Sequence, residues 1–146
     1  MKLARLLLLF ALATSAASAQ NFPPTPVDLR AAYCLASARS EVKFLRGLLE
    51  LPDLGPDVRL TVLQLQEAAF ETQERLRGYI LGRTSSLDVD GLLLASSQHE
   101  KDRAFNARMV KPCAASCVDM ACANKCGVPE LEAKFKQCRD TSFLPY

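Results

Sequence analysis

Two long periodic stretches decide the fold: residues 31–49, AAYCLASARSEVKFLRGLL, and residues 56–80, PDVRLTVLQLQEAAFETQERLRGYI. In each stretch the apolar side chains recur at alternating spacings of four and three, which places them in one stripe along an α-helix. The first stripe consists of Ala31, Leu35, Ala38, Val42, Leu45 and Leu49, and the second of Val58, Val62, Leu65, Ala69, Thr72, Leu76 and Tyr79. We therefore predict two long helices, each with one apolar face.

Residues 51–56, LPDLGP, separate the two stretches, and neither of the two prolines in this segment can continue a helix. A connection this short places consecutive helices antiparallel. At the other end of the first helix, Thr25, Pro26 and Asp28 supply a capping threonine, a proline at the first helical position and an acid in the first turn. These signals predict a long antiparallel helix hairpin.

The remainder of the chain also has helical signals and no convincing strand. Ser85 with Asp88 can cap a third helix, Pro112 is expected to break that helix and restart the chain, and Gly127 is a plausible helix stop. The third, fourth and fifth helices are predicted over about residues 88–110, 112–126 and 130–139. The predicted fold class is all-α, a small helical bundle of four to five helices built on the hairpin and cross-linked by disulfides.

The N-terminus has the order of regions that is typical of a secretory signal. Lys2 and Arg5 precede an apolar run over 6–13, and small residues end at Ala17-Ser18-Ala19. The run is shorter than a membrane-spanning helix, and no later stretch reaches that length. We predict a signal peptide over 1–19, an extended lead-in over 20–25 and a single helical domain over 26–146, exported to the periplasm or secreted.

The charge balance excludes some partners. The chain has 18 basic and 16 acidic side chains, and loss of Lys2 and Arg5 with the signal would leave sixteen of each. A neutral chain with scattered basic residues is not expected to bind nucleic acid. We expect instead a protein partner in the cell envelope or a small ligand held between helices. Oligomeric state stays open, because the stripe of the second helix suits either an internal core or a dimer seam.

Six cysteines in a short exported chain indicate a disulfide framework. They are Cys34, Cys113, Cys117, Cys122, Cys126 and Cys138. On one continuous helix Cys113 and Cys117 would lie within about 40° of each other, whereas Cys122 and Cys126 would point to roughly the opposite side. Cys117 and Cys138 lie at nearly equal numbers of residues from a turn at 127–129, so we predict that these two pair and that Cys34 bonds to one of the other four.

Two other uses of the cysteines are considered. The first is soft-metal binding, of copper or zinc, in which Cys113 and Cys117 would act with Met109, Met120 and His99 on one face of a continuous helix. The second is thiol redox chemistry, because the two Cys-x3-Cys pairs resemble the twin cysteine motifs of helical-hairpin proteins of the mitochondrial intermembrane space. Only four residues separate the pairs here, and no Cys-x-x-Cys occurs.

Motifs for catalysis and for cofactors are missing from the sequence. His99 is the only histidine, it lies in a polar stretch that is expected to face solvent, and no Gly-x-Ser-x-Gly elbow or phosphate-binding glycine loop occurs. We predict no cofactor, and we favour a binding or structural protein of the cell envelope over an unrecognised enzyme. Core packing is the expected role of the aromatic side chains, and docking on the bundle that of the apolar end 141–146. The aromatic residues concerned are Tyr33, Phe44, Phe70, Tyr79, Phe105 and Phe135.

Overall fold

The computed structural model describes residues 22–123 and 125–145, apart from the side chain of Met120. The predicted signal peptide and Gln20 therefore lie outside the described residues. The helices are α1 (Pro26–Leu49), α2 (Pro56–Arg83), α3 (Val89–Ala115), α4 (Met120–Ala123) and α5 (Pro129–Gln137). The described ranges contain no strand, only an isolated bridge between Phe22 and Leu87, which confirms the all-α class. None of the helices in these ranges combines the length and apolar character needed to cross a membrane.

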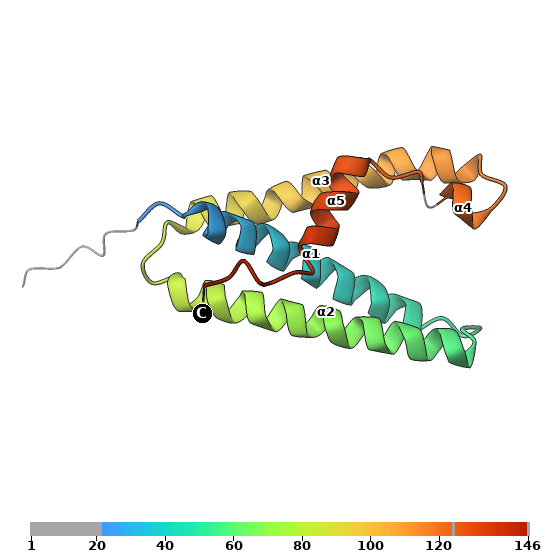
Figure 1. Ribbon diagram of the computed structural model, residues 1–146, viewed down its shortest axis with the longest axis horizontal. Coiled ribbons are helices and arrows are strands. Elements are labelled where there is room, and N and C mark those ends of the chain that lie inside the picture. The colour runs from blue at the N-terminus through green and yellow to red at the C-terminus, as the bar shows by residue number, and fades with distance from the viewer. Residues whose placement is uncertain (1–21, 124, 146) are drawn as a thin grey trace, which may run out of the picture.

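Helix α1 lies between α2 and α3 and packs against both (Figure 1). The hairpin of α1 and α2 is antiparallel, as predicted from the short connection. Helix α5 runs across from α3 to α1, while the last turns of α3 and the short α4 diverge from the hairpin. The molecule is therefore a long two-helix hairpin with a third helix alongside, and with the C-terminal segment folded back over α1.

Thr25 and Asp28 form the predicted capping box at the start of α1. The Asp28 carboxylate accepts hydrogen bonds from the Thr25 backbone at 2.8 Å and hydroxyl at 2.6 Å, and from the Tyr79 hydroxyl at 2.8 Å. Arg83 Nε lies 2.8 Å from the same carboxylate. Burial alone would raise the pKa of Asp28, but the bonds from Thr25 and Tyr79, helped by the charge of Arg83, hold this pKa below its ordinary 3.8. The cap therefore also ties α1 to the end of α2.

Two buried clusters follow the predicted stripe of α1. One contains Ala31, Cys34, Leu35 and Ala38 with Leu76 of α2, and the other contains Val42, Leu45, Val62 and Ala69. The stripe of α2 is covered only in part, because Val58 is 53% exposed and Leu65 is 46% exposed. Apolar surface is therefore left uncovered on the first half of α2, towards the connection with α1.

The predicted end of the third helix near residue 110 is wrong, since α3 continues through Pro112 to Ala115. Pro112 leaves the carbonyl of Arg108 without its helical donor, but Arg108 is exposed, so this carbonyl can bond to water while the helix continues. The predicted separate helix over 112–126 is also wrong, because its first residues belong to α3, the chain turns after Ser116, and within this range the described residues beyond that turn are helical only in α4. The predicted fifth helix is present as α5.

Three disulfides link the six cysteines: Cys34 to Cys138, Cys113 to Cys126, and Cys117 to Cys122. The predicted Cys117–Cys138 pair is therefore wrong. That prediction assumed a continuous helix from 112 to 126, whereas the turn after Ser116 folds the segment back and brings its own four cysteines together. Cys34 instead bonds to Cys138, which fixes the end of α5 on α1.

The apolar C-terminal end docks on the bundle, as predicted. Phe143 and Leu144 pack against the cluster around Cys34 and Leu76. The Arg30 guanidinium lies 4.0 Å from the centre of the Phe143 ring, a cation–π contact that holds this segment on α1. The segment therefore covers the end of the hairpin where α1 begins and α2 finishes. It leaves open the end near the connection between α1 and α2.

Candidate functional site

An open groove of about 960 Å³ lies between α1, α3 and α5, with α2 at its edge. Its apolar side comes mainly from the hairpin, where the lining residues are Phe44, Leu45 and Leu48 of α1 and Val62 and Leu65 of α2. Phe44 is 57% exposed although it is a large aromatic residue. Core packing, the role expected for this side chain, is therefore wrong for Phe44, and it is equally wrong for the half-exposed Phe70 and Phe105.

Both acidic side chains that line the groove already have partners. Arg139 donates to the Glu41 carboxylate at 2.8 Å, and the Asn106 amide donates to the Glu132 carboxylate. The side-chain oxygen of Asn106 accepts a hydrogen bond from the Val128 backbone N–H at 2.8 Å. This bond attaches the chain just before α5 to α3. Arg139 therefore balances the charge of Glu41, whereas the amide of Asn106 holds the Glu132 carboxylate in place without cancelling its charge.

Two basic side chains of the groove, Arg103 of α3 and Lys136 of α5, have no acidic partner within ion-pair distance in the described part of the chain. Arg103 lies one helical turn after His99, on the same face of α3. The cations that line the groove, which are these two and Arg139, outnumber its two carboxylates, so the groove is positive overall. The side of the groove that carries Arg103 and Lys136, opposite the apolar side, is thus suited to an anionic group.

His99 also lines the groove, and its side chain is only 3% exposed. The expectation that this histidine is a solvated surface residue is wrong: its ring packs edge-on against Tyr33 at 5.2 Å and against Phe135 at 5.5 Å between ring centres. Nδ1 has no hydrogen bond in the described structure, and the Glu100 carboxylate lies 3.6 Å away. Burial lowers the pKa of His99, since its effect and that of Arg103 outweigh the opposing acids, so the ring is neutral near pH 7.

Asp102 of α3 links α1, α3 and α5 close to His99. Its carboxylate accepts hydrogen bonds from Tyr33 of α1 at 2.8 Å, Gln98 of α3 at 2.6 Å and Lys134 of α5 at 2.8 Å. Burial alone would raise the pKa of Asp102, but the bonds from Lys134, Gln98 and Tyr33 lower it overall. Burial and the bond to Asp102 raise the pKa of Tyr33 far above its ordinary value. This network positions α5 over the groove.

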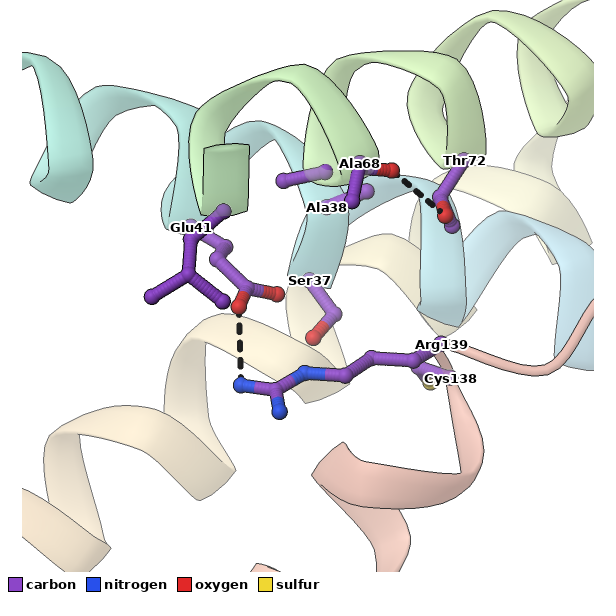
Figure 2. Close-up of a pocket in the computed structure, with 9 residues that line it drawn as sticks. Ser37, Ala38, Glu41, Ala68, Thr72, Cys138 and Arg139 are labelled. Atoms are coloured by element: carbon purple, nitrogen blue, oxygen red, sulfur yellow. Dashed lines mark hydrogen bonds and ion pairs between the residues drawn. The ribbon is translucent and has the colours of Figure 1, made fainter. Parts of the chain in front are cut away.

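A smaller pocket of about 130 Å³ lies between α1 and α2 beside the Cys34–Cys138 disulfide. Figure 2 shows its Glu41–Arg139 ion pair, which crosses the opening, and Ala38 and Ala68 on the two helices. The pocket shares four lining residues with the groove: Ser37, Glu41, Leu65 and Arg139. It is too small for more than a few atoms, so we regard it as an extension of the groove.

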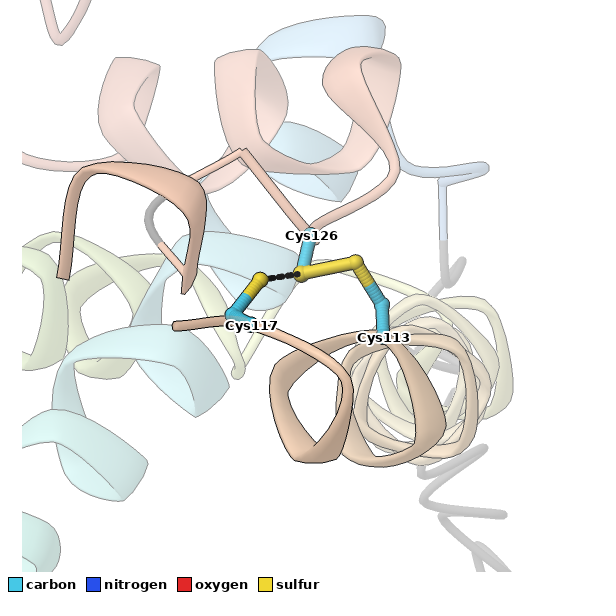
Figure 3. Close-up of side chains that lie close together, drawn as sticks. All are labelled: Cys113, Cys117 and Cys126. Carbon is cyan, nitrogen blue, oxygen red and sulfur yellow. Dashed lines mark hydrogen bonds between the residues drawn. A yellow bond between two sulfur atoms is a disulfide. The ribbon is translucent and has the colours of Figure 1, made fainter. Parts of the chain in front are cut away.

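The cysteines in the last turn of α3 and just after it form a second compact group. Sγ atoms of Cys113, Cys117 and Cys126 lie within 4.8 Å of one another, although Cys117 belongs to a different disulfide from the other two (Figure 3). All six cysteines are in disulfides, so thiolate ligands for a soft metal would have to be produced by reduction. The predicted helper ligands are placed differently: Met109 is half exposed, His99 lines the groove, and the Met120 side chain lies outside the described residues.

No protein-family model matches this chain, and comparisons with curated proteins and with solved structures find no match either. Inference about function therefore depends on the geometry of the groove and of the cysteine group.

Sequence reasoning did not identify the groove. Phe44 and Leu48 are four residues apart on the face next to the core stripe of α1, and this pairing is the signal that could have indicated a second apolar face. For α3 the informative spacing is that of Leu92, His99 and Asn106, which repeat every seven residues and are its buried residues. His99 was expected to face solvent because its neighbours in sequence are polar, whereas the rings that bury it come from α1 and α5.

Proposed function

We propose that the protein is an exported, disulfide-stapled binding protein of the cell envelope, whose groove between α1, α3 and α5 holds a small amphipathic molecule with an apolar chain and a carboxylate group. The observation that carries the proposal is the combination, in one groove of about 960 Å³, of uncovered apolar side chains with two cations that lack acidic partners. Ligand sites in proteins have volumes of roughly 300–1,000 Å³ and combine an apolar lining with a few polar groups.

The chemistry of the lining supports this class of ligand. An alkyl chain against Phe44, Leu48 and Leu65 would remove apolar surface from water, which favours binding by about 25 cal/mol for each Å². A carboxylate suits Arg103, because guanidinium and carboxylate groups form charge-assisted hydrogen bonds. Long-chain carboxylates have both parts, whereas a cationic or wholly polar ligand matches only one side of the groove.

Two features of the sequence support export. Residues 1–19 have the pattern of a cleavable signal, and the six paired cysteines require an oxidising compartment. The full chain should be expressed in a bacterial host and recovered from the periplasm. Intact-mass analysis is expected to show the loss of residues 1–19 and of six further hydrogens. Protein that keeps residues 1–19 and stays in the cytoplasm would contradict the assignment to the envelope.

Calorimetric titration of the exported protein with dodecanoate, below the concentration at which it aggregates, tests the ligand class. Dodecanol is the matched ligand because it has the same chain without the charge. We expect saturable binding of dodecanoate at one site per chain and weaker binding of dodecanol. Absence of binding by both compounds would refute the proposal, and equal binding of both would refute the assigned role of the cations.

Two leucines of α2 offer a matched pair of variants. Leu65 lines the groove and is 46% exposed, whereas Leu63 lies outside it and is 47% exposed. Leu65→Asp is expected to abolish dodecanoate binding, because it puts a negative charge on the apolar floor, and Leu63→Asp should bind as the unchanged protein does. Circular dichroism checks that both variants stay helical. A protein partner that inserts an apolar helix would be indicated if neither lipid bound and a partner were lost only with Leu65→Asp.

Soft-metal binding is the second candidate, and the closeness of three sulfur atoms favours it. Cys113, Cys117 and Cys126 would present thiolates within 4.8 Å of one another after reduction, a suitable set for copper(I) or zinc. Copper(I) should be titrated into the reduced protein under anaerobic conditions. Binding of one ion that is lost in Cys117→Ser and kept in Cys34→Ser would support this alternative.

A further inference from the structure

The two disulfides at the C-terminal end of α3 lie in contact with each other. Cys117 Sγ is 3.7 Å from Cys126 Sγ, although Cys117 is bonded to Cys122 and Cys126 to Cys113. Figure 3 shows the Cys117 sulfur beside the bonded Cys126–Cys113 pair, next to the Cys126 sulfur. The Cys117 and Cys113 sulfurs also lie within 4.8 Å of each other, so the three sulfurs are not in line. Once the Cys117–Cys122 bond is broken, the Cys117 side chain has to rotate to approach Cys126 opposite its bond to Cys113, while it already lies in contact with Cys126.

Access differs strongly between Cys122 and Cys126. Cys122 is exposed on α4 and Cys126 is only 6% exposed, whereas their partners Cys117 and Cys113 are both partly buried. The loop that carries Cys122 is held by a hydrogen bond of 2.8 Å from its backbone to the Asp119 carboxylate. A reductant from solution thus reaches the Cys122 sulfur first, and the buried Cys126 sulfur is reached most readily from within, by Cys117.

We propose that this double-disulfide loop is a thiol–disulfide exchange site that transfers reduction from the exposed Cys122 to Cys113, and that its partner is a dithiol, either a small molecule or a protein. The proposal is independent of the ligand groove. Its elements are the exposed Cys122, the 3.7 Å contact between the two disulfides, and the burial of Cys126.

The chemistry balances as follows. One thiolate of the dithiol attacks Cys122 Sγ, the Cys117–Cys122 bond breaks, and Cys117 leaves as a thiolate. The second thiol of the reductant then displaces Cys122, so that the dithiol is oxidised to a disulfide and two electrons enter the protein. The Cys117 thiolate attacks Cys126 Sγ, the Cys117–Cys126 bond forms, and Cys113 leaves as a thiolate that takes a proton from water. The second exchange needs no further electrons.

The proposal predicts which thiols are free after a two-electron reduction. Without exchange they would be Cys117 and Cys122, and with exchange they are Cys113 and Cys122. Because only thiolates attack disulfides, acid solution stops exchange and neutral solution permits it. The two conditions therefore separate the entry step from the transfer step.

The experiment uses the full exported chain and a limiting amount of a water-soluble phosphine, which reduces disulfides in acid and is itself oxidised to the phosphine oxide. One sample is cyanylated on its thiols in acid at once, and a second is held in neutral buffer before acidification and cyanylation. Peptide mass spectrometry then locates the label. We expect Cys117 and Cys122 to be labelled in the first sample, and most of the Cys117 label to move to Cys113 in the second.

Label that stays on Cys117 after the neutral period would overturn the transfer, and first reduction at Cys113–Cys126 would overturn the entry step. A matched pair of variants gives a second test that needs no reductant. Cys122→Ser leaves Cys117 as the single thiol, and we expect label on Cys113 in the isolated protein. In Cys117→Ser the single thiol is Cys122, which should keep the label. Label confined to Cys117 in Cys122→Ser would contradict the proposal.

Discussion

Cys34 of α1 and Cys138, which caps the end of α5, are joined by a disulfide whose Cα atoms lie 4.9 Å apart. The bond spans 104 residues and keeps the C-terminal segment on the hairpin. Chain entropy predicts that closing this loop stabilises the fold by roughly 5 kcal/mol, against roughly 2 kcal/mol for the five-residue separation of Cys117 and Cys122.

We therefore expect the double variant Cys34→Ala, Cys138→Ala to lose far more stability than Cys117→Ala, Cys122→Ala. Urea unfolding followed by circular dichroism at 222 nm, the helix band, measures the free energy of unfolding of each. A larger loss in the second double variant would show that α5 is held by its polar contacts and that the long-range disulfide contributes little.

Asp28 is the buried carboxylate that links the cap of α1 to Tyr79 and Arg83. Replacement by Asn removes the charge and leaves buried donors incompletely paired, which should lower the free energy of unfolding by about 1–3 kcal/mol. Asp57 is the matched control, because it is an exposed acid in the first turn of α2. Urea unfolding of Asp57→Asn should show a change of a few tenths of a kcal/mol. Equal losses in the two variants would contradict the role assigned to Asp28.

His99 predicts a pH dependence of stability. The folded protein holds its pKa below the ordinary 6.5, so between the two values the unfolded chain binds more protons than the folded one. Stability is therefore complete above about pH 6.5 and falls as the pH drops towards the folded-state pKa. His99 is the only histidine, and the lowered carboxylates titrate below 3.8, so the two effects occupy separate pH ranges.

Urea midpoints measured at a series of pH values test this dependence. The midpoint should fall between about pH 6.5 and pH 5 in the unchanged protein, whereas in His99→Gln it should stay nearly level over this range. An equal slope in the variant would mean that another group titrates and that the buried histidine is not responsible.

Local signals in the sequence predicted the hairpin well, because its determinants are local. The Thr25–Asp28 cap, the four-three periodicity and the two prolines in 51–56 act within a few residues, and each was found in the structure. Pro112 is a strong local signal for a helix end, but the prediction from it is wrong, because the carbonyl that loses its donor belongs to the exposed Arg108 and can bond to water.

The rest depends on contacts between distant residues. The pairing of Cys34 with Cys138 follows from how α5 crosses α1, and the burial of His99 follows from rings on two other helices. The groove follows from the incomplete covering of Phe44 and Leu65, which share the apolar character of their buried neighbours. Composition and spacing do not distinguish an apolar residue that is buried in the core from one that lines an open groove.

Arg103 tests the role of charge in the proposed site. Arg103→Gln should weaken dodecanoate binding about 5- to 10-fold, since a charge-assisted hydrogen bond in a partly open site contributes on the order of 1 kcal/mol. Binding of dodecanol should not change. Arg108→Gln is the control on the same helix, because Arg108 lies outside the groove and near Phe105. Titration calorimetry with both ligands compares the variants, and equal weakening in the two would indicate a general charge effect.

The most direct test of the groove uses the absence of tryptophan from the chain. Phe44→Trp places a single fluorophore in the groove, and Phe70→Trp places one at a similarly exposed position outside it, with the replaced side chains 57% and 52% exposed. On titration with dodecanoate, the emission of the tryptophan at position 44 should shift to shorter wavelength and saturate, while that at position 70 should not change. Equal shifts at both positions, or no shift at position 44, would contradict the claim that this groove is the binding site.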